Sequence, residues 1–274
     1  MILKLLSKYA DCDSVLLSGG VDSSAVAAAA VARGARPLAV VVSLRGCRSD
    51  LPYAAVVSSK LSIPLSARVV DRGEAVRAAE EVVGILKVFN PMEVVNCAVV
   101  YIGLSHAASL GAGRVCTGDG GDELFLGYGF FRRSRDLEKT RREVVERWRF
   151  CSFDVGRALG VEVVAPFTQR EVVEYALSIP AELALGKRPL REELAASLPE
   201  VATREKTPLE KGSCFDFLYD EFKRRAGDEV AYLKAVFEKM GLTYPRSPGG
   251  CPRCGYAGFD GRYCPMCGYY ARGD

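Results

Sequence analysis

The sequence predicts an α/β protein: a doubly wound parallel sheet, followed by a helical second half and a small cysteine-rich module near the C-terminal end. From residue 14 onward, short apolar runs alternate with longer amphipathic runs, which is typical of βαβ units. After Tyr128 the runs become charged and helical, and four closely spaced cysteines follow residue 250. With 274 residues, of which 49% are hydrophobic and 26% charged, the chain can bury a substantial core.

The first half supplies the predicted sheet. Strands are expected at residues 14–17, 38–43, 66–70 and 114–117. Their apolar character, without regular polar alternation, predicts strands that helices cover on both faces. Helices are expected between them at residues 22–33, 51–61, 73–88 and 92–110, and Gly34 is placed to end the first of these.

The second half is predicted to be mainly helical. Charged helices are expected at residues 135–150 and 170–177, followed by short segments broken by proline and a last helix at 215–240. Residues 244–250 contain two prolines and two glycines, which predicts a linker. The expected organisation is therefore a core at 1–130, a mainly helical region at 131–243, a linker at 244–250 and the cysteine-rich module at 251–274.

Composition gives weaker expectations about the setting of the protein. The net charge of +3 is too small to indicate a nucleic-acid partner by itself. We see no secretory signal, and the longest apolar run, residues 25–32, is too short to span a membrane, so we predict a cytoplasmic protein with reduced thiols and no membrane partner. Scarce amides predict a thermophile, in which intracellular disulfides also occur. Pairing of the cysteines outside the C-terminal module is therefore open.

The loop at residues 18–24, Ser-Gly-Gly-Val-Asp-Ser-Ser, follows a predicted strand and opens a helix. A helix N-terminus offers unpaired N–H groups and partial positive charge, which favour an anion. Asp22 would repel a bare phosphate, so Mg²⁺ is expected to bridge the two. We predict that this loop binds phosphate through Ser18, Gly19, Gly20, Asp22, Ser23 and Ser24. The alternative is an ordinary strand-to-helix turn with Asp22 or Ser23 as its N-cap.

This loop resembles the signature of the PP-loop ATP pyrophosphatases, enzymes that split ATP between the α and β phosphates. The resemblance implies that the loop holds pyrophosphate and that a substrate is adenylated. It also assigns residues 1–130 to a nucleotide-binding core of the adenine nucleotide alpha hydrolase-like class. ATP and Mg²⁺ are the cofactors that this implies.

A second acidic loop, residues 117–123, follows the predicted strand at 114–117. Loops after neighbouring parallel strands share one crevice, so Asp119 and Asp122 are expected to face the same magnesium–triphosphate. We predict Asp119 as a catalytic base, Asp22 and Asp122 as magnesium ligands, and Thr117 and Gly118 beside the nucleotide. A plain Gly/Asp turn is the alternative. A calcium loop is disfavoured because the twelve-residue ligand spacing is missing.

Together the two loops resemble the synthetase domain of asparagine synthetase and its β-lactam-forming relatives, whose second motif runs GDGGDELFGGY. Here Leu126 stands in place of one glycine. Residues 160–167, 187–191 and 198–206 continue the likeness. It implies that Lys187 is catalytic and neutralises charge on the phosphates, and that Lys206 contacts ATP or pyrophosphate. Without the resemblance, Lys187 would be predicted as a solvated surface lysine.

The sequence departs from this family at two positions that bear on the acceptor. Val164 and Gln169 stand where the family has Arg and Asp, which argues against aspartate as the acceptor. Full-length relatives also carry a glutaminase domain that begins with a nucleophilic cysteine, whereas this sequence begins with Met1. We therefore expect a small-molecule acceptor of unknown identity, with ammonia or an amine as donor, supplied free or by a separate protein.

Two CPxCG motifs predict a structural metal site. They supply Cys251, Cys254, Cys264 and Cys267. Four thiolates on tight turns form a closed tetrahedral site, for which zinc is favoured over iron and over a pair of disulfides. A zinc ribbon is therefore predicted. The other cysteines show no CxxC spacing, and four of them are predicted as small buried residues: Cys97, Cys116, Cys151 and Cys214. His106, in an apolar helix, is also predicted to pack.

Residues 132–149 hold eight basic and four acidic side chains, with aromatic residues nearby. With the ribbon, this stretch could contact tRNA. The alternative is an exposed helix with pairs such as Asp136–Lys139 and Glu143–Arg147. The preferred function is an adenylating enzyme that forms AMP and pyrophosphate and activates a carboxylate or carbonyl oxygen for attack by ammonia or an amine. The alternatives are a PP-loop enzyme that modifies tRNA by sulfur or nitrogen transfer, and a nucleotide-binding protein without catalysis.

Overall fold

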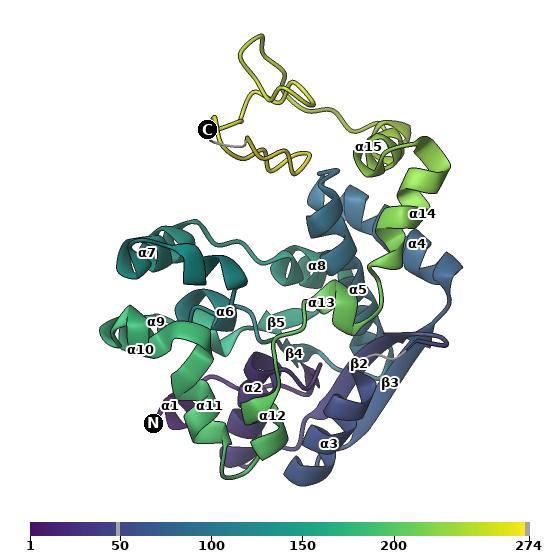
Figure 1. The fold of residues 1–274 in the computed structure, drawn as a ribbon. Coiled ribbons are helices and arrows are strands. Elements are labelled where there is room, and N and C mark those ends of the chain that lie inside the picture. The colour runs from purple at the N-terminus through teal and green to yellow at the C-terminus, as the bar shows by residue number, and fades with distance from the viewer. Residues whose placement is uncertain (48–49, 272–274) are drawn as a thin grey trace.

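A computed structural model describes residues 1–47 and 50–271 and contains one five-stranded parallel sheet. The strand order is β3-β2-β1-β4-β5, and Figure 1 labels β2, β3, β4 and β5. The strands are β1 Ser14–Leu16, β2 Leu38–Leu44, β3 Leu65–Val70, β4 Arg114–Cys116 and β5 Glu162–Val164. The four predicted strands are confirmed, whereas β5 was not predicted as a strand. The strand order reverses direction between β1 and β4, which makes their carboxyl ends a topological switch point.

Apart from the first, which was not predicted, the helices of the first half follow the prediction closely. They are α1 Ile2–Ser7, α2 Val21–Ala32, α3 Leu51–Leu61, α4 Arg72–Leu86 and α5 Pro91–Ser109. The second half contains α6 Gly121–Leu124, α7 Leu137–Arg147, α8 Cys151–Leu159, α9 Arg170–Ser178, α10 Ala181–Ala184, α11 Arg188–Leu194, α12 Pro199–Thr203, α13 Leu209–Gly212, α14 Phe217–Ala226 and α15 Glu229–Lys239. Short 3₁₀ turns lie at Gly129–Arg133, Pro166–Thr168 and Leu185–Lys187.

Two predicted helices differ from the structure. The helix expected at 215–240 is two helices, because Gly227 adopts a φ of +78° and ends α14. Asp228 then caps α15 by accepting a hydrogen bond from the backbone N–H of Ala231. The helix expected at 135–150 ends at Arg147, since Trp148 has an extended ψ of 143°.

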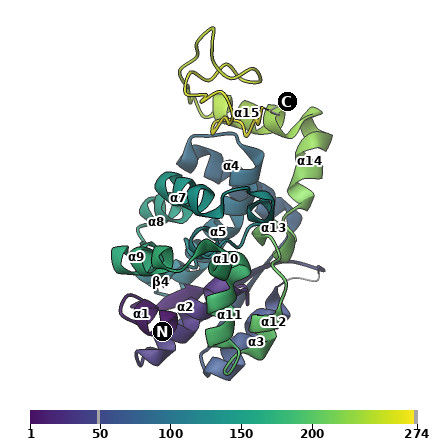
Figure 2. The same ribbon diagram turned by 60° about the vertical axis from the view of Figure 1, so that its left-hand side comes forward.

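The sheet separates two hydrophobic cores. Alternate side chains of β2 point to opposite faces: Val40 and Val42 pack with α4 and α5, and Ala39 and Val41 pack with α2 and α3. The first core continues into α14, α15 and the cysteine module, and the second into α9 and α11. Figures 1 and 2 show helices on both sides of the strands, with the cysteine module at one end of the molecule. The predicted doubly wound architecture is therefore present.

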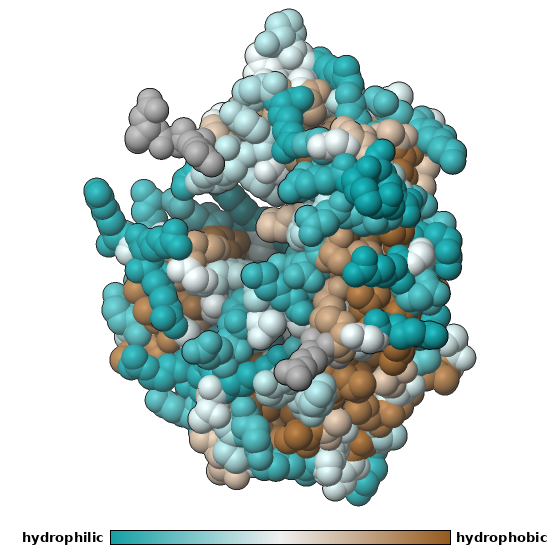
Figure 3. All heavy atoms as spheres, turned by 45° about the vertical axis from the view of Figure 1, so that its right-hand side comes forward, coloured by the Kyte–Doolittle hydropathy of each residue, from teal (hydrophilic) through white to brown (hydrophobic). Residues whose placement is uncertain are grey.

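Strand β3 lies at the edge of the sheet and corrects the expectation that every strand is buried on both faces. It pairs with β2 alone, and Val69 is 39% exposed. Val56 of the neighbouring α3 is also exposed. Figure 3, which brings the right-hand side of Figure 1 forward, shows hydrophobic residues gathered in the lower part of this face.

Two disulfides correct the expectation of reduced thiols. Cys12 is bonded to Cys116 and Cys47 to Cys214. Cys116 and Cys214 are buried, as predicted, but they are half-cystines and not free apolar residues. Of the two remaining cysteines outside the C-terminal module, Cys97 is buried and Cys151 partly exposed, and both are free thiols.

Among the described residues, no single helix is long and apolar enough to cross a membrane. Helices α4 and α5 pass a test of length and composition only as a pair, and the pair is bent by 108°.

Candidate active site

Two loops meet at the carboxyl ends of β1 and β4. Residues 18–20 leave β1 and enter α2, and residues 117–120 leave β4 and enter α6. The loops are so close that a Cβ added to Gly118 would lie 3.0 Å from the backbone N of Ser23. A side chain at this position would be tightly crowded, and the switch point brings the two acidic loops together as predicted.

Between these loops and the later helices lies a cavity of about 240 Å³. Ten of the predicted site residues line its polar side: Ser18, Gly20, Asp22, Ser23, Thr117, Gly118, Asp119, Asp122, Lys187 and Lys206. Gly19 and Ser24 do not line it. A Cβ on Gly19 would lie 2.6 Å from Tyr53, so this glycine serves the packing of the loop against α3. Ser24 is fully buried within α2.

The serines of the first loop are held by one another. The hydroxyls of Ser18 and Ser23 lie 3.2 Å apart, and the Ser18 hydroxyl accepts a hydrogen bond from the backbone N–H of Gly20 at 3.3 Å. Gly20 is the N-cap of α2 and has no side chain to satisfy the first N–H groups. The loop thus presents hydroxyls and a helix N-terminus to the cavity, which suits an anion.

Lys187 is placed by the backbone as well as by its charge. Its φ is +64°, and its N–H donates to the carbonyl of Phe125 at 2.8 Å. Leu126, which replaces a family glycine, keeps a positive φ of +47°, and its carbonyl accepts from Gly186 at 3.1 Å. Far from being a surface lysine, Lys187 is 4% exposed.

The side chain of Lys187 lies between two carboxylates. Its Nζ bonds Asp22 and lies 2.7 Å from Oδ1 of Asp122. Lys206 also bonds Asp122, and its Nζ lies 4.8 Å from the ring centroid of Tyr128. Four charged side chains thus form a cluster beside the N-terminus of α2: Asp22, Asp122, Lys187 and Lys206.

Burial and pairing act in opposite directions on the charges of this cluster. Burial raises the pKa of Asp22 above its usual value, despite the nearby lysines. Burial also acts to raise the pKa of Asp122, but Lys187 and Lys206 outweigh it and the pKa is lowered. Burial lowers the pKa of Lys187 less than the two carboxylates raise it, so this lysine stays charged.

The donor set of the cluster fits a hard cation. Oδ1 of Asp22 is buried and has no hydrogen-bond partner among the described residues. Lys187 forms ion pairs with both Asp22 and Asp122, so the two carboxylates lie close enough together to bind one cation. Carboxylate oxygens are the protein ligands that Mg²⁺ uses beside phosphates, so these two residues would hold it.

Among the described residues, two hydroxyls and no cationic side chain bind Asp119. Oδ2 accepts hydrogen bonds from Thr117 at 2.7 Å and from Ser152 at 2.5 Å. Burial raises the pKa of Asp119 above its usual value. Ser152 belongs to α8 and also lines the cavity. It was not predicted as a site residue, because no motif surrounds it in the sequence.

Sequence reasoning also missed the pair formed by Asp50 and Arg204. The two side chains are ion-paired and each is 9% exposed. Arg204 donates to the carbonyl of Ser18 at 3.0 Å, and its guanidinium lies 3.8 Å from the ring centroid of Tyr53. Arg204 falls in a stretch that resembles the family, but nothing in the sequence marked Asp50.

The lining of the cavity also includes an apolar wall, which was not predicted. It consists of Leu16, Leu17, Val40, Val41, Val42, Val99, Val100 and Gly103. They belong to β1 and β2, to the position directly after β1, and to α5. The wall and the charged cluster together suit a ligand with an apolar ring at one end and phosphates at the other.

Glu123 and Tyr128 form a hydrogen bond at the end of the second loop. The Tyr128 hydroxyl donates to Oε1 of Glu123 at 2.7 Å, and burial raises the pKa of Glu123 to about 7. Neither residue was predicted as part of the site.

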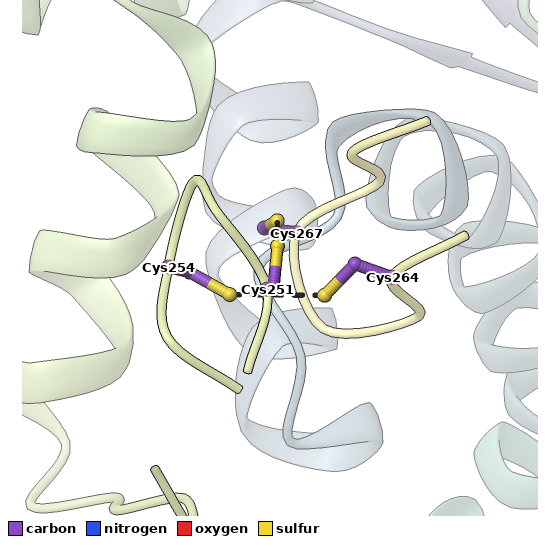
Figure 4. A group of neighbouring side chains, drawn as sticks. All are labelled: Cys251, Cys254, Cys264 and Cys267. Carbon is purple, nitrogen blue, oxygen red and sulfur yellow. Dashed lines mark hydrogen bonds between the residues drawn. The ribbon is translucent and has the colours of Figure 1, made fainter. Parts of the chain in front are cut away.

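The four cysteines of the C-terminal module converge on one point (Figure 4). Their Sγ atoms all lie within 4.8 Å of one another, and all four side chains are buried. The two knuckles repeat one geometry: Gly255 donates to the Cys251 carbonyl at 2.7 Å, and Gly268 to the Cys264 carbonyl at 2.8 Å. A closed set of four thiolates fits zinc, with no position left for a substrate.

The module packs against the N-terminus of α5. The backbone N–H of Phe89 donates to the carbonyl of Met266 at 3.0 Å, and Asn90 donates to the Tyr263 hydroxyl at 2.7 Å. Arg253 forms an ion pair with Asp228 at the start of α15, 2.5 Å away. The last three residues of the predicted module, 272–274, lie outside the described residues.

The basic stretch at residues 132–149 is only partly a charged surface. Arg141 is fully buried and donates to the carbonyls of Ala176 and Ile179, at the end of α9. Asp136 caps α7 by accepting from the backbone N–H of Lys139. This differs from the expected Asp136–Lys139 side-chain pair. The exposed basic side chains are Arg132, Arg133, Arg135, Lys139, Arg142, Arg147 and Arg149.

Three further positions lie away from the cavity. Val164 and Gln169 line a separate depression beside β5. His106 packs between α5 and β3, with Nε2 2.8 Å from the Ser66 hydroxyl, in agreement with its predicted packing role.

Gly127 gives a direct test of this geometry. A Cβ at this position would lie 1.9 Å from Oδ1 of Asp122 and 2.2 Å from Cε of Lys187. We expect Gly127→Ala to lower the free energy of unfolding by roughly 1–3 kcal/mol through overpacking. Chemical denaturation measures this loss. Gly129→Ala is the matched control, because nothing lies within 4 Å of its added Cβ; equal stability of the two variants would contradict the arrangement.

Comparison with known proteins gives one consistent family. The asparagine synthase family model matches residues 14–152 and 154–244. A putative glutamine-hydrolysing asparagine synthetase of Methanocaldococcus jannaschii is 30% identical over 200 residues, covering 65% of this chain and 35% of that protein. The glutamine-hydrolysing asparagine synthetase of Mus musculus is 26% identical over 262 residues, covering 86% of this chain and 46% of that protein. The chain thus spans about a third to a half of the length of these relatives.

A solved structure of a U34-tRNA thiolase from Methanococcus maripaludis, with its 4Fe-4S cluster, is also similar. The match covers 90% of this chain and 80% of that chain, with 11% identity and a TM-score of 0.33. A TM-score this low supports no conclusion about fold or function.

Proposed function

Because the chain belongs to the asparagine synthase family, we propose that it adenylates a substrate oxygen with ATP and releases pyrophosphate. The family implies an ATP pyrophosphatase-type enzyme. The observation that carries the finer proposal is the cavity itself, whose lining combines a helix N-terminus, two lysines and an apolar wall. Adenine suits the apolar wall, and the β and γ phosphates suit the serine loop.

In this reaction a substrate oxygen attacks the α phosphorus, and the bond to the bridging oxygen of pyrophosphate breaks. Negative charge then builds on the leaving pyrophosphate. Lys187 and Lys206 would stabilise that charge, since both carry ammonium groups beside the loop at residues 18–23. Mg²⁺, held by Asp22 and Asp122, would supply further positive charge to the phosphates.

We assign Asp119 the task of accepting a proton from the attacking amine or ammonia in the second step. The two hydroxyls from Thr117 and Ser152 fix the carboxylate without neutralising it. The nitrogen then displaces AMP from the adenylated carbon, which gives an amide-type bond. A carboxylate or carbonyl oxygen is the proposed acceptor class.

A second candidate is the same adenylation on a tRNA base, followed by sulfur or nitrogen transfer. The observation that favours it is the set of seven exposed basic side chains between Arg132 and Arg149, on the half of the protein that also carries the cysteine module. Arginine-rich surfaces bind phosphate backbones. The two candidates share the nucleotide cavity and differ in the acceptor.

Pyrophosphate release tests both candidates. The purified chain is incubated with ATP, Mg²⁺ and, in separate reactions, aspartate, other small carboxylates with ammonia, or unmodified tRNA. Release that requires a small carboxylate supports the first candidate, and release that requires tRNA alone contradicts it. No pyrophosphate with any acceptor would favour a binding protein without catalysis.

Asp119→Asn tests the proposed base. We expect product formation to fall about 10²–10⁴-fold while ATP binding is retained, because asparagine keeps the shape but cannot accept the proton. In the unchanged protein, the raised pKa of Asp119 means that activity falls as pH is lowered through that pKa. Full activity of Asp119→Asn across the pH range would contradict the role.

A further inference from the structure

Residues 204–208, here called the strap, join α12 to α13 and form neither helix nor strand (Figures 1 and 2). Four consecutive strap residues line the cavity: Arg204, Glu205, Lys206 and Thr207. The strap contributes Lys206 to the charged cluster. Its position therefore bears on anything that binds in the cavity.

The first end of the strap is fixed by arginines. Arg191 donates to the carbonyl of Ala202 at 2.8 Å and to that of Arg204 at 2.7 Å. The side chain of Arg204 pairs with Asp50 and donates to the carbonyl of Ser18. This end is attached to the loop at residues 18–24 through contacts that do not depend on redox state.

The far end is fixed by a covalent bond and two backbone hydrogen bonds. Cys214, two residues after α13, is bonded to Cys47, in the turn after β2. Beside this bond, the N–H of Asp50 donates to the carbonyl of Gly212 at 2.7 Å, and that of Leu44 to Ser213 at 3.2 Å. The cystine joins segments 167 residues apart and is the covalent restraint on this end.

The two disulfides differ in access to solvent. Cys47 is exposed, whereas its partner Cys214 is 7% exposed. In the other disulfide, Cys12 is 9% and Cys116 0% exposed. Thiol–disulfide exchange requires a thiolate to reach one sulfur, so only the Cys47 side of the first bond offers a ready target.

We propose that Cys47–Cys214 is a thiol–disulfide exchange site, at which a dithiol releases the far end of the strap and weakens nucleotide binding. One thiolate of the dithiol attacks Sγ of Cys47, and Cys214 leaves as a thiolate that takes up a proton. The second thiol of the dithiol then attacks the first sulfur of the same dithiol, which is bonded to Cys47 in the mixed disulfide. The thiolate of Cys47 is released and takes up a proton. Two electrons pass from the dithiol, which becomes a cyclic disulfide, to the protein.

This inference rests on the proposed function for its nucleotide. The test measures binding of an ATP analogue with a methylene bridge between the α and β phosphorus atoms, to the full chain with and without dithiothreitol. We expect reduction to raise the Kd about tenfold. Cys47→Ser should show the raised Kd under both conditions, which also separates this effect from any action of the dithiol on the four-cysteine module. Cys12→Ala is the matched control and should keep the affinity of the oxidised protein.

Several outcomes would overturn the proposal. Alkylation and mass spectrometry that find Cys47 and Cys214 free in protein purified without reductant would do so. An unchanged Kd after proven reduction, or Cys47→Ser that binds like the oxidised protein, would do so too. If the oxidised protein does not bind the analogue, the proposed function fails. Release of the strap is then tested by the rate of trypsin cleavage after Arg204 or Lys206. Faster cleavage after reduction supports release of the strap, and an equal rate contradicts it.

Discussion

Replacing Lys187 by methionine is expected to lower pyrophosphate release by about 10³-fold or more. One preorganised charge contact to a developing anion is worth about 10²–10³ in rate, and a cation at a phosphoryl-transfer site about 10³–10⁵. The same change leaves Asp22 and Asp122 with one cation fewer in a buried site. We therefore also expect the free energy of unfolding to fall by about 3–5 kcal/mol.

Because the variant is less stable, activity must be measured below its own unfolding temperature. Thermal unfolding gives that temperature, and a coupled pyrophosphate assay gives the rate. Lys206→Met is the matched control, since its side chain is 31% exposed and Asp122 is its one ion-pair partner among the described residues. It should cost less stability and less activity. A folded Lys187→Met variant with near-normal pyrophosphate release would remove Lys187 from the mechanism.

Removal of metal from the four-cysteine module is expected to unfold that module. Structural zinc contributes about 10–16 kcal/mol of apparent binding free energy in zinc-finger peptides, which is folding free energy for so small a unit. A strong chelator should therefore make residues 251–271 sensitive to protease and lower the Tm of the chain. Elemental analysis of the untreated protein should find about one zinc per chain, and iron in its place would correct the assigned metal.

The module packs on Phe89 and Asn90 at the start of α5, some distance along that helix from the cavity-lining residues Val99 and Val100. ATP binding should therefore survive chelation. Cys267→Ser should reproduce the effect of the chelator, and Cys97→Ser, at a buried thiol outside the module, is the control. A chelated protein with unchanged Tm and unchanged protease resistance would contradict a structural metal.

The sheet and the two acidic loops could be predicted because their signals are local. Buried parallel strands are apolar throughout, and a Gly-rich loop between a strand and a helix is typical of an anion-binding site. Strand β5 was missed because it is a short strand at the edge of the sheet whose first residue, Glu162, is exposed, so it lacks the continuous apolar pattern of the inner strands. The break at Gly227 was missed because Asp228 starts a new helix at once, so the apolar pattern shows little interruption.

The charged cluster could be predicted only in part. Asp22 and Asp122 stand in recognisable loops, but Lys187 was identified through resemblance, since no local pattern shows that a lysine will be buried between them. The partners of Arg204 and of Cys214 lie 154 and 167 residues away. Pairings at such separations depend on the complete tertiary arrangement, which local patterns in the sequence do not reveal.

The strand order also has a consequence for how the protein acquires its activity. The cavity draws on stretches of chain around residues 18, 119, 187 and 206, and loops of that length close slowly because their entropy must be lost before contacts form. Until α11 and α12 have docked, the acidic loops face each other without their lysines. We therefore expect nucleotide binding to appear only in the last phase of refolding, after most of the helical signal has returned.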